Sequence, residues 1–343
     1  DLLKALNKAI ADAGSELPEA VVENKKATLT LTNDVELETY TSIFDDVDEV
    51  ELNLNGHKLT VPGNSALSVP ASKKLYINGE GDVADNVLFL DHDYAGINVA
   101  AGAELYVENV TIQVPEESEN AYAVWFNSQA SSTSKVVMRN SAIYGARGLY
   151  ANGNIKSEQP EIVLENVDIT ATDGSGLYLA GNTKTTITGG TIRATETGGN
   201  GLEVRAGVVE LNGVDVICES LKDSGDYDAV INGNGSTGKY AALSVARHST
   251  NADTSVTVTG GSLTGAVAIG MNSKTGSQTG DVDVTVINAD VDGEIINQYE
   301  GSVLTVNGVN WPYVAPPAVE TPPTQGGEEE EGGEDVEEPT SEN

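Results

Sequence analysis

Short runs of alternating apolar and polar residues fill most of the chain and recur along it. Examples are ELNLNGHKLTV at 51–61, EIVLENVDITA at 161–171 and VVELNGVDVIC at 208–218. Alternation with a period of two predicts β-strands that bury one of their faces. Each run is divided near its middle by Asn-Gly, Asn-X or Gly-Gly. The divisions begin at residues 55, 78, 109, 140, 166, 189, 212, 260, 288 and 307.

A third apolar run lies between successive copies, as in GLYLAGN at 176–182 and GLEVRAG at 201–207. An Asn-Gly between two strands normally predicts a β-hairpin, since both residues tolerate the left-handed backbone region. Three strands per repeat favour a solenoid instead. We therefore expect about ten coils, counted from the ten divisions, with a long insertion or a degenerate extra coil at 219–240.

The repeat length and the Asn-rich second turn resemble the right-handed parallel β-helix of the pectate-lyase-like superfamily. The resemblance covers roughly residues 27–313. The opening is also similar to β-helix modules of bacterial cell-surface proteins, which often begin with a helix and a strand before an "LNGH" coil, here Leu54 to His57. The resemblance implies an all-β fold with three strands per coil. It also implies that polysaccharide, where it binds, lies along the sheet formed by the first strands.

Both ends of the chain depart from the repeat. Apolar residues share one helical face in the first turns, which predicts a helix that caps the open end of the solenoid. They are Leu2, Leu6, Ala9, Ile10 and Ala13. From residue 315 onward the chain holds ten acids, five prolines and no base, which predicts a disordered tail. We therefore expect a capping helix and lead-in at 1–26, a parallel β-helix at 27–314 and a Pro/Glu-rich linker or tail at 315–343.

Composition and charge narrow the partners. The 343 residues include 53 acids and 18 bases, for a net charge of −35. Such a chain repels polyanions, so nucleic acid is not an expected partner. No apolar stretch is long enough for a membrane helix, and the chain starts at Asp1 without a leader. These features predict an extracellular or cell-surface protein, either a monomer or a module of a longer chain. The single cysteine, Cys218, alternates inward and is expected to be a buried, inert thiol.

Alternation also predicts two columns of side chains that point outward from the first strands. The first column is Ser68, Asn98, Trp125, Tyr150, Tyr178, Glu203, Ser244 and Ala268. The second is Pro70, Ala100, Asn127, Asn152, Ala180, Arg205, Ala246 and Gly270. Adjacent aromatic side chains on a surface are typical of a binding site. The alternatives are an aromatic ladder that only stabilises the sheet, or one covered by a long loop. The predicted ligand-binding residues are Trp125, Asn127, Tyr150, Asn152, Tyr178, Glu203 and Arg205.

Catalytic chemistry has weaker support. The calcium-binding acids of pectate lyases and the motifs of polygalacturonase-type hydrolases do not occur in the expected order. One cluster could support acid–base chemistry on a uronic-acid glycan, or be a surface ion-pair cluster. It comprises Glu203, Arg205, Asp226, Asp228, Arg247 and His248. Asp91-His92-Asp93 is either a weak metal motif or a solvated turn. No metal site or cofactor is predicted, although acidic loops could bind calcium.

Three functions remain open from the sequence. The first is a non-catalytic, secreted or surface-displayed module that binds a polysaccharide or a cell-surface glycoprotein through the Trp125–Tyr178 face. The second is a polysaccharide lyase or glycoside hydrolase with its site near Glu203. The third is a purely structural spacer within a larger surface protein.

Overall fold

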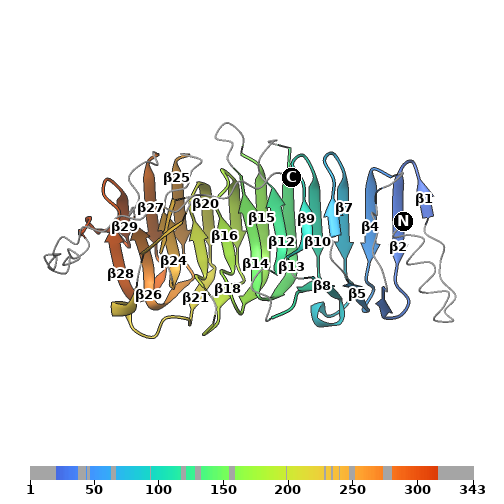
Figure 1. Cartoon of the computed structure of the whole chain (residues 1–343), viewed down its shortest axis with the longest axis horizontal. Helices are drawn as coiled ribbons and strands as arrows, with labels where there is room; N and C mark the ends of the chain where they lie inside the picture. Colours follow the sequence, from blue (N-terminus) through green and yellow to red (C-terminus); the bar gives the residue numbers. More distant parts are fainter. Residues whose placement is uncertain are drawn as a thin grey trace, which may run out of the picture.

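The computed structural model of the chain is an all-β parallel solenoid of about eight turns, with almost no helix. Its strands stack along one long axis (Figure 1). The predicted capping helix and nearly all of the predicted tail lie outside the described residues. The structure describes residues 21–37, 44, 47–62, 67–92, 94–116, 121–127, 133–153, 159–197, 199–227, 229–232, 235–238, 240–246, 252–272 and 280–315.

Each complete turn contributes one strand to each of three parallel faces. The first face contains β6 (Leu67–Val69), β9 (Ala95–Val99), β12 (Tyr122–Asn127), β14 (Arg147–Asn152), β16 (Leu177–Leu179), β19 (Leu202–Val204), β24 (Ala241–Ala246) and the second halves of β26 (Ser262–Asn272) and β28 (Asp290–Gln298).

The second face is formed by the strands that follow those of the first face along the chain. It contains β2 (Lys26–Thr30), β4 (Glu49–Asn53), β7 (Lys74–Asn78), β10 (Glu104–Glu108), the first halves of β13 (Lys135–Gly145) and β15 (Glu161–Ala171), β17 (Lys184–Thr188), β20 (Gly207–Asn212), β25 (Thr254–Thr259), β27 (Val282–Ile287) and β29 (Val303–Val306).

The third face completes the turn. It contains β3 (Val35–Glu36), β5 (Lys58–Pro62), β8 (Val87–Asp91), β11 (Thr111–Gln113), the second halves of β13 and β15, β18 (Thr191–Ala194), β21 (Asp215–Cys218) and the first halves of β26 and β28. Two short antiparallel pairings accompany the parallel faces, and a third lies at the C-terminal end of the described strands. Strand β1 (Val21–Glu23) pairs with β2, and β22 (Ala229–Asn232) pairs with β23 (Gly235–Gly238).

The prediction of ten coils is too high, and the difference lies at the two ends. The first predicted repeat, 51–61, forms β4 and β5 but is preceded by no first-face strand among the described residues. The last, 303–313, forms β29 and then folds back antiparallel as β30 (Val309–Asn310). Asn307 and Gly308 between them have φ angles of 48° and 82°, which is the twist a two-residue hairpin requires. The alternating pattern of 303–313 is the same as that of the complete coils, so alternation does not distinguish a coil from a hairpin.

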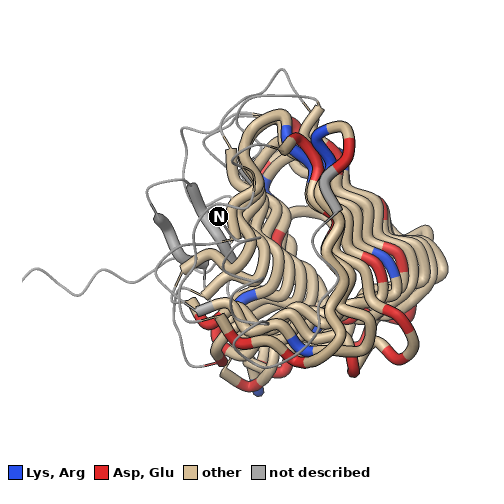
Figure 2. Tube along the Cα trace, turned by 90° about the vertical axis from the view of Figure 1, so that its right-hand side faces the viewer, with Lys and Arg blue, Asp and Glu red and all other residues tan. Residues whose placement is uncertain are grey.

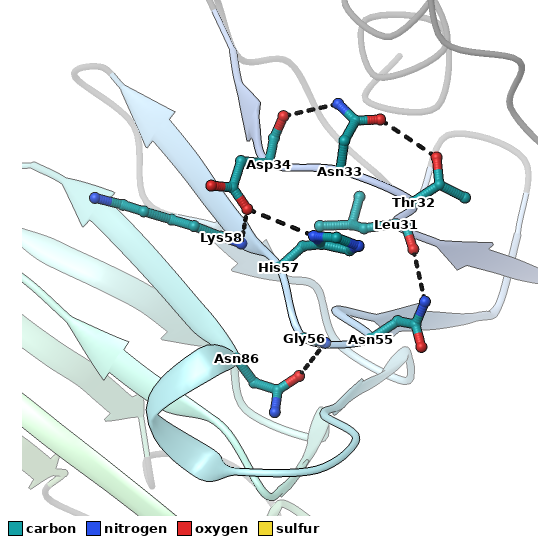
Figure 3. A network of polar contacts seen from close by, with 9 residues as sticks. All are labelled: Leu31, Thr32, Asn33, Asp34, Asn55, Gly56, His57, Lys58 and Asn86. Carbon is teal, nitrogen blue, oxygen red and sulfur yellow. Dashed lines mark hydrogen bonds and ion pairs between the residues drawn. The ribbon is translucent and has the colours of Figure 1, made fainter.

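The predicted left-handed turns between the second and third faces are confirmed. Asn55, Asn109 and Asn166 have φ angles of 52°, 57° and 52°. Asn55 also donates from Nδ2 to the carbonyl of Leu31 in the preceding coil at 3.1 Å, which ties adjacent turns together (Figure 3). Asn78-Gly79 is an exception, because a short 3-10 helix (Val83–Asp85) widens that turn. Buried Asn86 fills the widened turn and accepts from the backbone N–H of Gly56 at 2.7 Å.

Inward-facing apolar residues form continuous columns through the core. One column on the second face runs through Leu52, Ile77, Val107, Met138 and Leu164, all at most 3% exposed. Cys218 is 3% exposed, its Sγ donates to the carbonyl of Gly199, and burial raises the pKa of the thiol. The burial predicted for this thiol is therefore confirmed.

The outer side of the second face carries an alternating row of bases and acids. Its members are successive register partners: Lys26, Glu49, Lys74, Glu104, Lys135, Glu161 and Lys184. We call these seven residues the ion ladder. Lys74 lies 3.4 Å from Glu104, and Lys135 lies 2.6 Å from Glu161. The view along the axis shows basic and acidic positions stacked side by side on neighbouring coils (Figure 2).

Candidate functional site on the first face

The first face brings the predicted aromatic residues together. Trp125, Tyr150, Tyr178 and Glu203 are register partners on successive strands, as the sequence predicts. Ser244 follows Glu203 in this column, but the next position is Gly270 and not the predicted Ala268. Strands β24 and β26 pair without a register shift, but two residues further along β26 than the repeat alignment predicts.

The second predicted column is correct in part. Asn127 and Asn152 are register partners, as expected. Ala246 pairs with Asn272, so the predicted Gly270 is replaced there by a residue two positions further along β26. The same two-residue offset accounts for both errors in this strand.

Five aromatic rings form a connected cluster on this face, which we call the aromatic stripe: Tyr94, Tyr122, Trp125, Tyr150 and Tyr178. The rings of Tyr150 and Tyr178 stack with centroids 4.9 Å apart. Tyr122 links Trp125 to Tyr150, with centroid distances of 5.0 and 4.4 Å. Tyr94 lies 5.6 Å from Trp125, with the two rings inclined by 33°. Sequence reasoning missed Tyr94 and Tyr122, because Tyr122 belongs to a neighbouring column and Tyr94 precedes its strand.

The stripe is open at one end and closed at the other. Tyr94 is 51% exposed, and Tyr122 and Trp125 are half-buried. Tyr150 is only 9% exposed. The prediction that both columns point into solvent is therefore wrong for Tyr150, Glu203 and Ser244 of the first column and for Arg205 of the second, which are buried.

Buried polar groups hold the closed end. Arg205 is fully buried, and its Nη1 donates to the hydroxyl of Tyr178 at 2.8 Å. Its Nε lies 4.0 Å from Oε1 of Glu203. The other carboxylate oxygen of Glu203 accepts from Nδ2 of Asn200 at 3.1 Å, and Asn200 accepts from the backbone N–H of Ala241 at 2.9 Å. Arg205 and Glu203 are thus structural supports of the stripe, which is the role that the geometry gives them.

The insertion at 219–240 covers the face beyond this point. Leu221 and Tyr227 pack with Ala241 and Val267 in a small apolar cluster. A Cβ atom on Gly270 would lie 2.4 Å from the hydroxyl oxygen of Tyr227, so glycine makes room for this ring. The sequence predicts this loop at the edge of the face, whereas Tyr227 lies on the face itself. Asp228, Arg247 and His248 lie outside the described residues, as does the side chain of Asp226, so their clustering with Glu203 stays a prediction.

Burial also fixes the protonation of the closed end. Burial raises the pKa of Tyr178 to about 12; the charge of Glu203 adds to this shift and Arg205 opposes it. Burial likewise raises the pKa of Tyr150. Both phenols therefore stay neutral hydrogen-bonding groups well above the pH at which an exposed tyrosine ionises.

Arg147 is a further polar residue of the stripe that sequence reasoning missed. Its Nη1 donates to the hydroxyl of Tyr122 at 2.9 Å, and its guanidinium lies over the Tyr122 ring at 5.2 Å. Its Nη2 lies 3.4 Å from Oδ2 of Asp173. The side chain packs flat over Gly174, where an added Cβ would lie 2.6 Å from Cγ of Arg147. Contact with Gly174 and Tyr122 therefore orients this guanidinium.

The remaining candidate clusters show no metal-site geometry in the part of the chain that the structure describes. Nδ1 of His92 accepts from the backbone N–H of Tyr94 at 2.7 Å, as in a turn, and Asp93 lies outside the described residues. Nδ1 of His57 lies 3.6 Å from Oδ1 of Asp34, beside the turn between the second and third faces (Figure 3). Within the described ranges, no group of three His, Cys, Asp or Glu side chains is placed to hold a metal ion. The described part of the chain also contains no helix with the length and apolar character needed to cross a bilayer.

Comparisons of the chain with protein-family models, with curated proteins and with solved structures gave no match.

Proposed function

We propose that this chain is a non-catalytic β-solenoid module that binds carbohydrate at the open end of the aromatic stripe. The observation that carries the proposal is the pair formed by Tyr94 and Trp125, whose rings lie 5.6 Å apart at 33°. Tyr94 is 51% exposed although the described chain exposes few large apolar side chains. Flat aromatic surfaces of this kind stack against the apolar faces of sugar rings, and exposed aromatic patches tend to mark binding surfaces.

The surroundings hold these rings in place before any ligand arrives. Tyr122 contacts the rings of Tyr94 and Trp125 at 82° and 73°, so its edge supports both. Arg147 in turn holds the hydroxyl of Tyr122. A platform that is already ordered loses little side-chain entropy on binding, which favours affinity.

The position of Glu203 counts against the lyase or hydrolase alternative. A general acid or base must come within hydrogen-bond reach of the substrate. Glu203 is 6% exposed and its carboxylate contacts Asn200 and Arg205. This carboxylate is therefore better explained as a support for the closed end.

We place the module outside the cell or at the cell surface, where it would bind a polysaccharide or a cell-surface glycoprotein. The net charge of −35 and the Pro/Glu-rich composition from 315 onward support this placement. Membership of the pectate-lyase-like superfamily is a prediction that rests on the turn pattern.

Glycan arrays followed by calorimetry on the bound glycan test the proposal. We expect Trp125→Ala to weaken binding by at least about tenfold, the equivalent of about 1.4 kcal/mol. The matched control is Tyr106→Ala, which removes one ring of the stacked Tyr76–Tyr106 pair on the second face. This control should bind like the wild type. An array without signal, or equal binding by both variants, would contradict the proposal and favour a structural spacer.

A further inference from the structure

We propose that the ligand of the open end is a neutral glycan chain, and that Arg147 and Asp173 bind its hydroxyl groups. This inference rests on the proposed function and specifies the chemical class of its ligand. It is carried by the charges around the stripe and by the geometry of one half-exposed ion pair.

The charged surroundings of the open end disfavour an anionic ligand. The described acids near the open end are Asp91, which precedes Tyr94, and Glu116, and residues 91–120 contain no Lys or Arg. Asp91 and Glu116 are exposed, and the carbonyl of Glu116 accepts from Oγ1 of Thr172 at 2.8 Å, which places Glu116 near Asp173. Uronate or sulfate groups on a ligand would approach these carboxylates and be repelled.

The two arginines of the stripe do not offset this repulsion. Arg205 is fully buried against Tyr178 and Glu203. Arg147 lies next to Asp173, so the pair presents no net charge to a ligand. A neutral ligand is therefore favoured over a polyanion at this surface.

The Arg147–Asp173 pair instead has the chemistry needed for hydroxyl groups. Its side chains are 23% and 34% exposed, and the closest atoms lie 3.4 Å apart. The guanidinium can only donate hydrogen bonds and the carboxylate can only accept them. Neighbouring sugar hydroxyls do both, so one can donate to Asp173 while the next accepts from Arg147. Hydrogen bonds to charged groups are among the stronger ones, even where the ligand is neutral.

The strands that carry these residues indicate the direction in which a bound glycan would run. Tyr94 immediately precedes β9, Trp125 belongs to β12 and Arg147 to β14, which are adjacent strands of the first face. Strand spacing is about 4.8 Å, so the platform and the ion pair span roughly 10 Å along the solenoid axis. If one sugar of the glycan stacks on Trp125, the next sugars would extend towards Asp173.

A cationic ligand is disfavoured by the contacts between the rings. Quaternary ammonium groups bind between separated aromatic rings that surround the cation. The ring centroids of Tyr94, Tyr122 and Trp125 lie 5.0 to 5.8 Å apart, which is the separation of directly packed aromatic rings. The ligand must therefore stack on their outer surface.

Calorimetry on the full chain separates these classes. The probes are neutral hexasaccharides of glucose, mannose and xylose, the acidic hexagalacturonate, and choline, each at about 50 mM and about 500 mM salt. We expect a neutral hexasaccharide to bind with less than about twofold change between the salts, and hexagalacturonate to bind at least about tenfold more weakly. Tighter binding of hexagalacturonate or of choline would overturn the inference.

Variants test the ion pair itself. Asp173→Asn and Arg147→Met should each weaken the neutral hexasaccharide by about tenfold. The matched control is Arg193→Met, which removes the base of the Arg193–Glu219 ion pair on the third face and should bind like the wild type. Asp173→Asn should also narrow the preference for the neutral over the acidic probe, an effect that a purely structural role would not produce. Unchanged binding by both variants would overturn the inference.

The outcomes show whether only the preference for a neutral glycan fails or whether carbohydrate binding itself fails. If hexagalacturonate binds best and Trp125→Ala abolishes that binding, the carbohydrate site stands and its neutral preference is wrong. If no saccharide of either class binds, the proposed function fails as well.

Discussion

The ion ladder and the aromatic stripe lie on the same coils of one solenoid, but their side chains are satisfied differently. In the ladder, each base has an acid on the neighbouring coil, and its ion pairs remain partly exposed, as with Lys135 and Glu161 at 34% and 42%. In the stripe, aromatic rings contact one another, and the charges at its closed end are buried, with Arg205 fully so. The ladder alternates base and acid from coil to coil, with ion pairs at Lys74–Glu104 and Lys135–Glu161, whereas the stripe ends at an exposed ring, Tyr94.

This difference shows what each face can contribute. Partly exposed ion pairs add little stability singly, but a slip by one coil would bring like charges such as Lys74 and Lys135 together, so the ladder specifies the register between coils. The stripe gains stability from burial at one end and leaves apolar surface uncovered at the other. A ligand is therefore expected at the first face and not at the second.

The largest expected effect compares one charge from each face. Arg205→Ala leaves the Glu203 carboxylate buried without its guanidinium neighbour, and we expect a loss of about 3 kcal/mol or more in unfolding free energy. Lys135→Ala removes an exposed partner of Glu161 and should cost less than about 1 kcal/mol. Denaturant titrations measure both. Similar small losses would show that burial does not distinguish the two faces.

Alkaline titration sharpens the comparison through the phenols. Since the pKa of Tyr178 rises from 10.0 to about 12 only in the folded state, the unfolded chain ionises first as pH increases. The stability that this tyrosine contributes is complete below pH 10 and is lost as the pH rises towards 12. Phenolate absorbance of wild type minus Tyr178→Phe isolates its titration. Glu203→Gln should lower this pKa, and a midpoint near 10 in the wild type would contradict the buried environment.

Charge reversal tests the ladder as a register device. Glu104→Lys places a base between Lys74 and Lys135, and we expect a loss of about 1–2 kcal/mol at low salt that shrinks at high salt. Glu210→Lys is the control, because its register partners are the uncharged Thr186 and Thr257. Denaturation at two salt concentrations provides the measurement. Equal, salt-independent losses in both variants would remove the electrostatic explanation.

The sequence predicts those features that repeat within one coil and misses those that depend on neighbouring coils. The left-handed Asn turns and the register of Trp125, Tyr150 and Tyr178 follow from local alternation and turn residues. The ion ladder is missed because its members lie in separate repeats and pair only when the register is known. Alternation predicts the side of the strand on which a side chain lies, but not whether another segment covers that side. The burial of Arg205 is missed for this reason. The small residues Ser244 and Gly270 in the neighbouring column, which continues from Glu203, are the one local signal that something packs there.

The smallest effect comes from removing a single oxygen atom from each face. Tyr106→Phe keeps the stack on Tyr76, with rings 4.8 Å apart at 9°, and loses only the hydrogen bond that the Tyr106 hydroxyl donates to Glu104. Water and Lys74 can still satisfy this half-buried carboxylate, so we expect less than about 0.5 kcal/mol in unfolding free energy. Tyr178→Phe removes the same atom but takes an acceptor from the fully buried Arg205, so its cost should be larger, about 1–2 kcal/mol. Equal costs, measured in parallel denaturant titrations, would mean that the closed end of the stripe is as accessible to water as the ladder, and its role as a rigid support for the open end would then fail.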